Sequence, residues 1–130
     1  MQIGAACLKY ANDHGGEYPD SLGTLLMNED ITSVEFYCPG SGDTPAEGAT
    51  KQEVAQNMIA GGHLSYVYLG RGLTRAMIGG STIIAYERPS IFPDGANVLW
   101  GDGHADFQNP KVIGGIVTKS AAGVFPITVP

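Results

Sequence analysis

The chain opens with apolar residues at helical spacing. Within residues 1–16, Ile3, Cys7 and Tyr10 share one helical face with Ala6 beside them, and a Gly pair ends the segment. The first turn lacks an N-cap residue, as expected of a helix that starts further upstream; a frayed native N-terminus is the alternative. The pattern therefore predicts an amphipathic N-terminal helix, and we expect it to belong to a longer one.

Two further segments favour helices. Three leucines at helical spacing predict a short second helix over residues 20–27. Thr50 and Glu53 have capping-box spacing ahead of an apolar stripe, which predicts a third helix that ends at a Gly pair. Between these helices we expect a brief extended piece at residues 34–37 and an irregular loop over residues 40–49.

β-Branched and aromatic residues dominate the next part of the chain. Residues 64–69 and 81–87 predict two strands joined by a Gly-containing connection. The tail that starts at Pro110 has a short apolar stretch that predicts one or two helical turns. Helices therefore come first and antiparallel strands last, which predicts an α+β fold with a closing β-hairpin.

The segment ANVLWGDGHADF, residues 96–107, predicts that hairpin, and two registers compete for it. A three-residue loop would place Trp100 opposite His104 and Val98 opposite Asp106, which mixes apolar and polar side chains on one face. This mixture argues against the three-residue loop.

A two-residue turn at Asp102 and Gly103 separates the two kinds of side chain. Asp-Gly is a favoured sequence for a type I′ turn, and this register pairs Trp100 with Ala105. We therefore predict the tight turn. Its inward-facing residues would be Val98, Trp100, Ala105 and Phe107, with Leu99, His104 and Asp106 on the other face.

Size and charge narrow the classes of function. The 130 residues suit one compact domain, and 19 Gly with 8 Pro imply many turns and long loops. The net charge of −6 argues against nucleic acid and anionic lipid as partners. No apolar run reaches the roughly 20 residues that a membrane span needs.

Two segments resemble a known family. QIGAACLKYANDHGGEYPDSLGTLL is similar to the segment that follows the membrane helix in bacterial pseudopilins. AYERPSIFPDGANVLWGDGHADF resembles the C-terminal signature of prepilin-type processing-associated proteins, in which a His and nine residues precede Asp-Gly, and FYCPGSGD resembles their Cys-Pro loop. The sequence departs from the signature at one position, because Phe92 stands where the family has its His.

The resemblance implies a pilin-like fold, with the N-terminal amphipathic helix packed on a small antiparallel sheet. Residues 1–130 would form the single head domain of a protein with an upstream membrane helix, cleaved by a prepilin peptidase. The protein would be a structural subunit of a type II secretion pseudopilus or a type IV pilus-like filament. It would be anchored to the inner membrane and exposed to the periplasm or cell surface. Its partners would be other pseudopilin subunits and the secretion machinery, and we expect no enzymatic activity.

The resemblance also raises a disulfide and a calcium site. An oxidising compartment would permit a bridge between Cys7 and Cys38, and the alternative is two buried thiols. Major pseudopilins bind calcium in a loop close to the C-terminal sheet, and calcium prefers six to eight oxygen ligands. The candidate ligands are Asp94, Asp102 and Asp106, with Glu87 nearby; a solvated acidic rim explains them equally well.

Active-site motifs are missing from the sequence. It has no nucleophile elbow, phosphate loop or zinc spacing, and Gly70-Arg71-Gly72 lacks the third glycine of a nucleotide loop. Asp102 and His104 flank a predicted turn, so a small hydrolase is disfavoured. A secreted ligand- or carbohydrate-binding module is the other alternative, suggested by four aromatic residues that a packed core explains better. They are Tyr66, Tyr68, Tyr86 and Trp100.

Overall fold

The computed structural model describes residues 2–39, 41–88, 94–124 and 126–128. Its four α-helices are α1 (Gln2–Asp13), α2 (Leu22–Asn28), α3 (Lys51–Ala60) and α4 (Pro110–Ala121). Its four strands are β1 (Tyr66–Tyr68), β2 (Ile83–Glu87), β3 (Ala96–Trp100) and β4 (Ala105–Gln108). Two 3₁₀ helices, η1 (Ser33–Phe36) and η2 (Arg75–Met77), lie in the connections. The mixture of helices and an antiparallel sheet confirms the α+β class.

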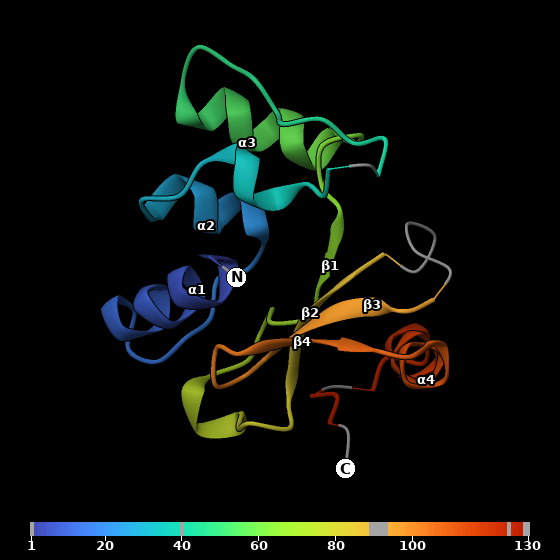
Figure 1. Ribbon diagram of the computed structural model, residues 1–130. Coiled ribbons are helices and arrows are strands. Elements are labelled where there is room, and N and C mark those ends of the chain that lie inside the picture. Colours follow the sequence, from blue (N-terminus) through green and yellow to red (C-terminus); the bar gives the residue numbers. More distant parts are fainter. Residues whose placement is uncertain (1, 40, 89–93, 125, 129–130) are drawn as a thin grey trace.

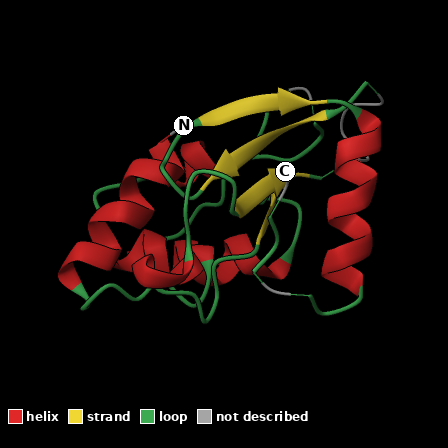
Figure 2. Ribbon diagram, turned by 90° about the horizontal axis from the view of Figure 1, so that it is seen from below, coloured by secondary structure: helices red, strands yellow, loops and turns green. Residues whose placement is uncertain are grey.

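The strands form one antiparallel sheet in the order β1-β2-β3-β4, so each strand pairs with its neighbour in sequence. Helices α1 to α3 lie to one side of this sheet and α4 lies to the other (Figures 1 and 2). The sheet is therefore covered on both faces, which explains why all five residues of β2 are buried.

The helices begin where local capping chemistry predicts. The Ser21 hydroxyl accepts a hydrogen bond from the Thr24 amide at the start of α2, and the Thr50 hydroxyl accepts one from Glu53 at the start of α3. The Glu53 carboxylate accepts in turn from the Ala49 amide, one residue before the position that a capping box uses. The helices predicted over residues 20–27 and after Thr50 are confirmed.

The core is divided by the sheet into two clusters. The larger cluster joins α1, α2 and α3 to one face of the sheet, and it includes Ile3, Cys7, Ala11, Leu25, Met58 and Leu99. The smaller cluster joins the other face to α4 and to Ile127, and it includes Val98, Trp100, Ile113 and Ile116. A bulge between Ile83 and Ala85 shifts the alternation of β2, so that the consecutive residues Ile84 and Ala85 both join the larger cluster.

Two predicted elements were wrong. Residues 34–37 are not extended, because Ser33–Phe36 forms η1, which buries Phe36 completely in the larger cluster. The tail is a 12-residue helix rather than one or two turns. Asn109 caps α4 by accepting a hydrogen bond from the Val112 amide, and Pro110 occupies the first turn, which is a strong start signal in the sequence.

The remaining predictions have mixed outcomes. The strands predicted at residues 64–69 and 81–87 exist but are shorter, and the first is limited to Tyr66–Tyr68. Within the described residues no helix is long and apolar enough to cross a membrane. The residue that precedes α1 and the signature position Phe92 lie outside the described residues.

Candidate functional site: the signature hairpin and its contact with α1

The β3–β4 hairpin has the three-residue loop that the sequence analysis rejected. Leu99 pairs with Ala105 and Val98 with Asp106, and the Trp100 amide donates to the His104 carbonyl at 2.9 Å. The predicted pairing of Val98 with Phe107 is therefore wrong. Phe107 is 55% exposed instead of facing inward.

Backbone conformation explains this correction. A type I′ turn requires positive φ at both central residues, and among the described residues only glycines have it. Gly103 has a φ of 92° and follows Asp102, as in a three-residue loop that closes with a left-handed residue. The single glycine at the third loop position therefore favours this loop over the two-residue turn.

Two polar side chains on the Trp100 face, Asp106 and His104, contact the indole ring. The Trp100 indole N–H donates to the Asp106 carboxylate at 2.8 Å, and Trp100 itself is only 7% exposed. The His104 ring stacks on the indole with centroids 5.8 Å apart. A buried Trp needs an acceptor for its N–H, and here that acceptor is Asp106, opposite Val98, so an apolar residue at position 106 would leave the N–H unsatisfied.

Asp102 and His104 form a contact at the end of the hairpin. The Asp102 carboxylate accepts from the His104 amide at 3.0 Å and also contacts His104 Nδ1. These bonds hold the pKa of Asp102 below its usual value. Both side chains are about half exposed, at 51% and 50%. The acid–base pair expected of a hydrolase would lie in a pocket, whereas this pair lies at an open turn.

Helix α1 packs directly against this hairpin. A Cβ atom added to Gly4 would lie 2.7 Å from the Leu99 side chain and 2.9 Å from the Gly103 carbonyl oxygen. Leu8 lies one turn further along α1. A Cβ atom added to Gly103 would lie 3.0 Å from the Leu8 side chain. Only glycine at position 4 permits this approach, so α1 and the hairpin loop are matched in shape.

Cys7 and Tyr18 also lie where α1 meets the hairpin loop. The Tyr18 hydroxyl donates to the Gly101 carbonyl at 3.4 Å. Burial raises the pKa of the Cys7 thiol to about 12 and the pKa of Tyr18 to about 12. Both groups therefore stay protonated at neutral pH, and they act here as packing and hydrogen-bonding groups.

Cys38 belongs to a buried polar cluster that sequence reasoning missed. Its thiol donates to the Glu87 carboxylate at 2.9 Å, and its amide donates to the Ser65 hydroxyl at 2.7 Å. Ser65 donates in turn to Asp43. Burial, and then the bond to Glu87, raise the pKa of Cys38, which is the opposite of what a nucleophilic cysteine requires. The cluster links the loop after η1 to the sheet.

Of the two alternatives for Cys7 and Cys38, the disulfide is not formed in the structure. Cys7 and Cys38, both among the described residues, are buried free thiols. Cys7 lies in the larger core cluster beneath the hairpin, whereas Cys38 is bonded to Glu87 on β2. The alternative of two buried thiols therefore describes the structure.

The candidate calcium ligands are dispersed. Glu87 is buried, and its carboxylate accepts from Cys38 and from the Asn97 amide. Asp102 and Asp106 lie on either side of His104, and Asp94 is exposed just before β3. Among the described residues, no three acidic, His or Cys side chains are grouped as metal ligands would be. The structure brings Asp102 and Asp106 near one His and leaves Asp94 and Glu87 apart from them.

The four aromatic residues do not form one ligand-binding face. Tyr66 and Tyr68 pack against the larger cluster, and the Tyr68 hydroxyl donates to the Pro19 carbonyl at 2.7 Å. Tyr86 and Trp100 are buried in the smaller cluster, on the opposite face of the sheet. Gly70-Arg71-Gly72 lies in the turn after β1.

Comparison of the chain with protein-family models, with curated proteins and with solved structures gives no match.

Proposed function

We propose that this chain is the head domain of a pseudopilin-like subunit, carried into a secretion pseudopilus or a pilus-like filament by a membrane helix continuous with α1. The subunit would be anchored in the inner membrane, with its head in the periplasm or at the cell surface. Its role would be contact with neighbouring subunits, without turnover of a substrate. The proposal starts from the two sequence segments that resemble this family.

The contact between α1 and the signature hairpin is the observation that supports the proposal. A subunit held in a filament through one helix must transmit force from that helix to its head, so the two must be rigidly joined. Ile3, Cys7 and Ala11 are buried on the sheet side of α1, and Gly4 brings the helix backbone against Leu99 and Gly103. The two segments that carry the resemblance are therefore in direct contact.

The test is the processing of the complete gene product. The gene with its natural upstream sequence is expressed in bacteria with and without a prepilin peptidase, and the membrane-bound protein is followed by immunoblot and intact mass. We expect a charged leader, a peptidase-dependent mass decrease, and an apolar stretch of about 20 residues retained in the mature protein.

A second measurement addresses assembly. Sheared surface filaments from a strain that produces the processed protein should contain it, whereas an uncleavable leader variant should leave the protein in the membrane fraction. Removal of a plain signal peptide, with release of the protein into the periplasm, would overturn the proposal and favour the secreted ligand-binding module.

A further inference from the structure

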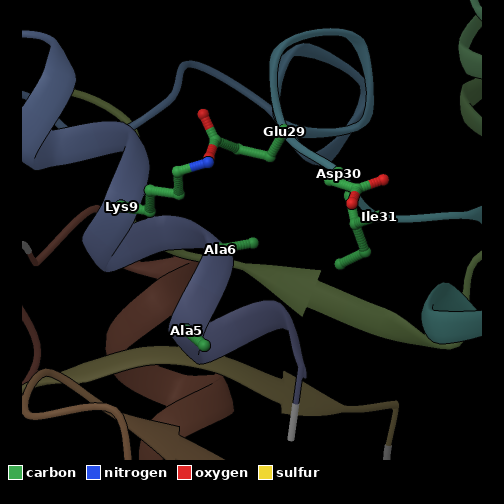
Figure 3. A pocket seen from close by; sticks show the side chains of 6 residues that line it. All are labelled: Ala5, Ala6, Lys9, Glu29, Asp30 and Ile31. Carbon is green, nitrogen blue, oxygen red and sulfur yellow. The ribbon is translucent and has the colours of Figure 1, made fainter.

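A cavity of about 170 Å³ lies between α1 and the segment that follows α2. Ala5, Ala6 and Lys9 line it from the helix, and Glu29, Asp30 and Ile31 line it from the other side (Figure 3). The volume is close to that of cavities that hold a molecule of about six heavy atoms. None of these residues takes part in the hairpin contacts described above.

Glu29 lines this cavity, and one of its carboxylate oxygens lacks a hydrogen-bond donor among the described residues. Its side chain is 5% exposed, and its Oε1 atom is buried and accepts no hydrogen bond from any described residue. Lys9 Nζ lies 3.8 Å away, beyond hydrogen-bond distance, with the Lys9 side chain 68% exposed. The two side chains point toward one another across the cavity (Figure 3). A buried carboxylate oxygen without a donor is costly, and a donor that takes the place of Lys9 beside Oε1 would relieve that cost.

The main chain holds Glu29 in this position. Its amide donates to the Leu25 carbonyl at 3.0 Å at the end of α2, and its own carbonyl accepts from Lys51 Nζ at 3.0 Å. The Ile31 amide also donates to that carbonyl, at 2.9 Å. These bonds fix the backbone of Glu29 at the end of α2, beside the cavity.

The lining defines the chemistry of the occupant. Glu29 and Asp30 provide acceptors and negative charge, while Ala5, Ala6 and Ile31 provide an apolar wall. An anion would face two carboxylates, and a neutral alcohol would leave the buried charge unpaired. A cation with several N–H donors and a short aliphatic body satisfies both parts of the cavity. Lys9 is exposed, so its side chain can turn away from Glu29 into solvent.

We propose that this cavity binds a small organic ammonium ion, with the ammonium group hydrogen-bonded to Glu29 and the aliphatic part against Ala5, Ala6 and Ile31. Lys9 competes for the same carboxylate and moves to solvent when the ligand enters. The site uses none of the hairpin residues, so its binding test can fail without affecting the processing test of the proposed function.

The probe is n-butylammonium, with butyrate and n-butanol as charge-reversed and neutral comparators. Amide chemical shifts of residues 5–9 and 29–31 are followed by two-dimensional NMR during each titration. We expect saturable shifts confined to these residues with n-butylammonium, with a Kd on the order of 1 mM for so small a ligand. The two comparators should cause no saturable shift.

Three variants test the roles of the side chains. Glu29→Gln should weaken n-butylammonium binding about tenfold or more, because it removes the charge from the acceptor. Lys9→Ala should strengthen binding several-fold, because it removes the competing ammonium. Glu47→Gln changes the net charge by the same amount on an exposed residue outside the cavity, and it should leave the Kd unchanged.

Several results would overturn the proposal. These are shifts spread over the acidic surface without saturation, equal binding of butanol or butyrate, and unchanged affinity in Glu29→Gln. If Glu29→Gln does not fold, the Lys9→Ala titration decides alone, and a loss or absence of tighter binding there counts against the site.

Discussion

Trp100 is the residue on which the side chains of the hairpin converge. Val98 lies beside it in the core, Asp106 accepts its indole N–H, and His104 stacks on its ring. The ring is thus apolar on one side and hydrogen-bonded at its edge. The register of the hairpin therefore buries the Trp100 ring in the core and also gives its N–H an acceptor.

Replacing Asp106 should test this role. Asp106→Ala removes the acceptor from the buried indole N–H, and we expect the free energy of unfolding to fall by about 1 kcal/mol. Asp106→Asn keeps an acceptor oxygen and should cost less. Urea denaturation followed by Trp100 fluorescence measures both. Equal stability of the Ala variant and the unmodified chain would show that the bond contributes nothing.

The hairpin carboxylates should also influence the acid sensitivity of the fold. Hydrogen bonds to His104 lower the pKa of Asp102, and hydrogen bonds to Gln108 and Trp100 lower that of Asp106. An unfolded Asp titrates near a pKa of about 3.9. Their contribution is therefore present above that pH and is lost as pH falls through the folded pKa values.

Carboxyl carbon NMR titration checks the cause of these shifts. In His104→Ala, the Asp102 pKa should rise part of the way toward its ordinary value, because the backbone amide at residue 104 still donates. The Asp106 pKa should change less, since its two main donors remain. A larger rise at Asp106 than at Asp102 would contradict this assignment.

At the scale of elements, Gly4 marks a close contact between α1 and the β3–β4 hairpin, which lie far apart in the sequence. Gly4→Ala would gain helix propensity of about 1 kcal/mol, but its new Cβ would collide with Leu99 and with the Gly103 carbonyl. We expect a net loss of about 1–2 kcal/mol in the free energy of unfolding, because overpacking a tight contact exceeds the propensity gain.

Gly114 on α4 provides the matched control for that substitution. It is exposed, and a Cβ there would meet nothing within 4 Å, so Gly114→Ala should stabilise the fold by about 0.5–1 kcal/mol. Denaturation curves of the two variants should therefore move in opposite directions. Movement in the same direction would show that α1 does not approach the hairpin as closely as described.

At the scale of the whole molecule, both thiols lie inside a core that is closed on each side of the sheet. Cys7 is 1% exposed and Cys38 is 6% exposed. Native protein should therefore react slowly with iodoacetamide, while unreduced protein in concentrated urea should gain two labels by intact mass. The absence of labels in urea before reduction, and their appearance after it, would establish a disulfide.

Local signals in the sequence determined the class and most of the elements. Helical spacing of apolar residues located α1, α2 and α3, and the capping residue Thr50 set the start of α3. These features depend on neighbours within a few residues, so they can be read without the fold. The helix α4 was accessible in the same way through Asn109 and Pro110, although the apolar stretch alone suggested only a turn or two.

Tertiary contacts decided the rest. The hairpin register depends on the acceptor that Trp100 needs and on the α4 side of the core, where Val98 and Trp100 are buried. The Cys38–Glu87 pair joins residues 49 positions apart, and the Glu29 cavity exists only because α1 lies against the end of α2. Sequence spacing determines which face of an element is apolar, whereas only packing determines which buried polar atoms find a partner and which, like the Glu29 oxygen, are left without one.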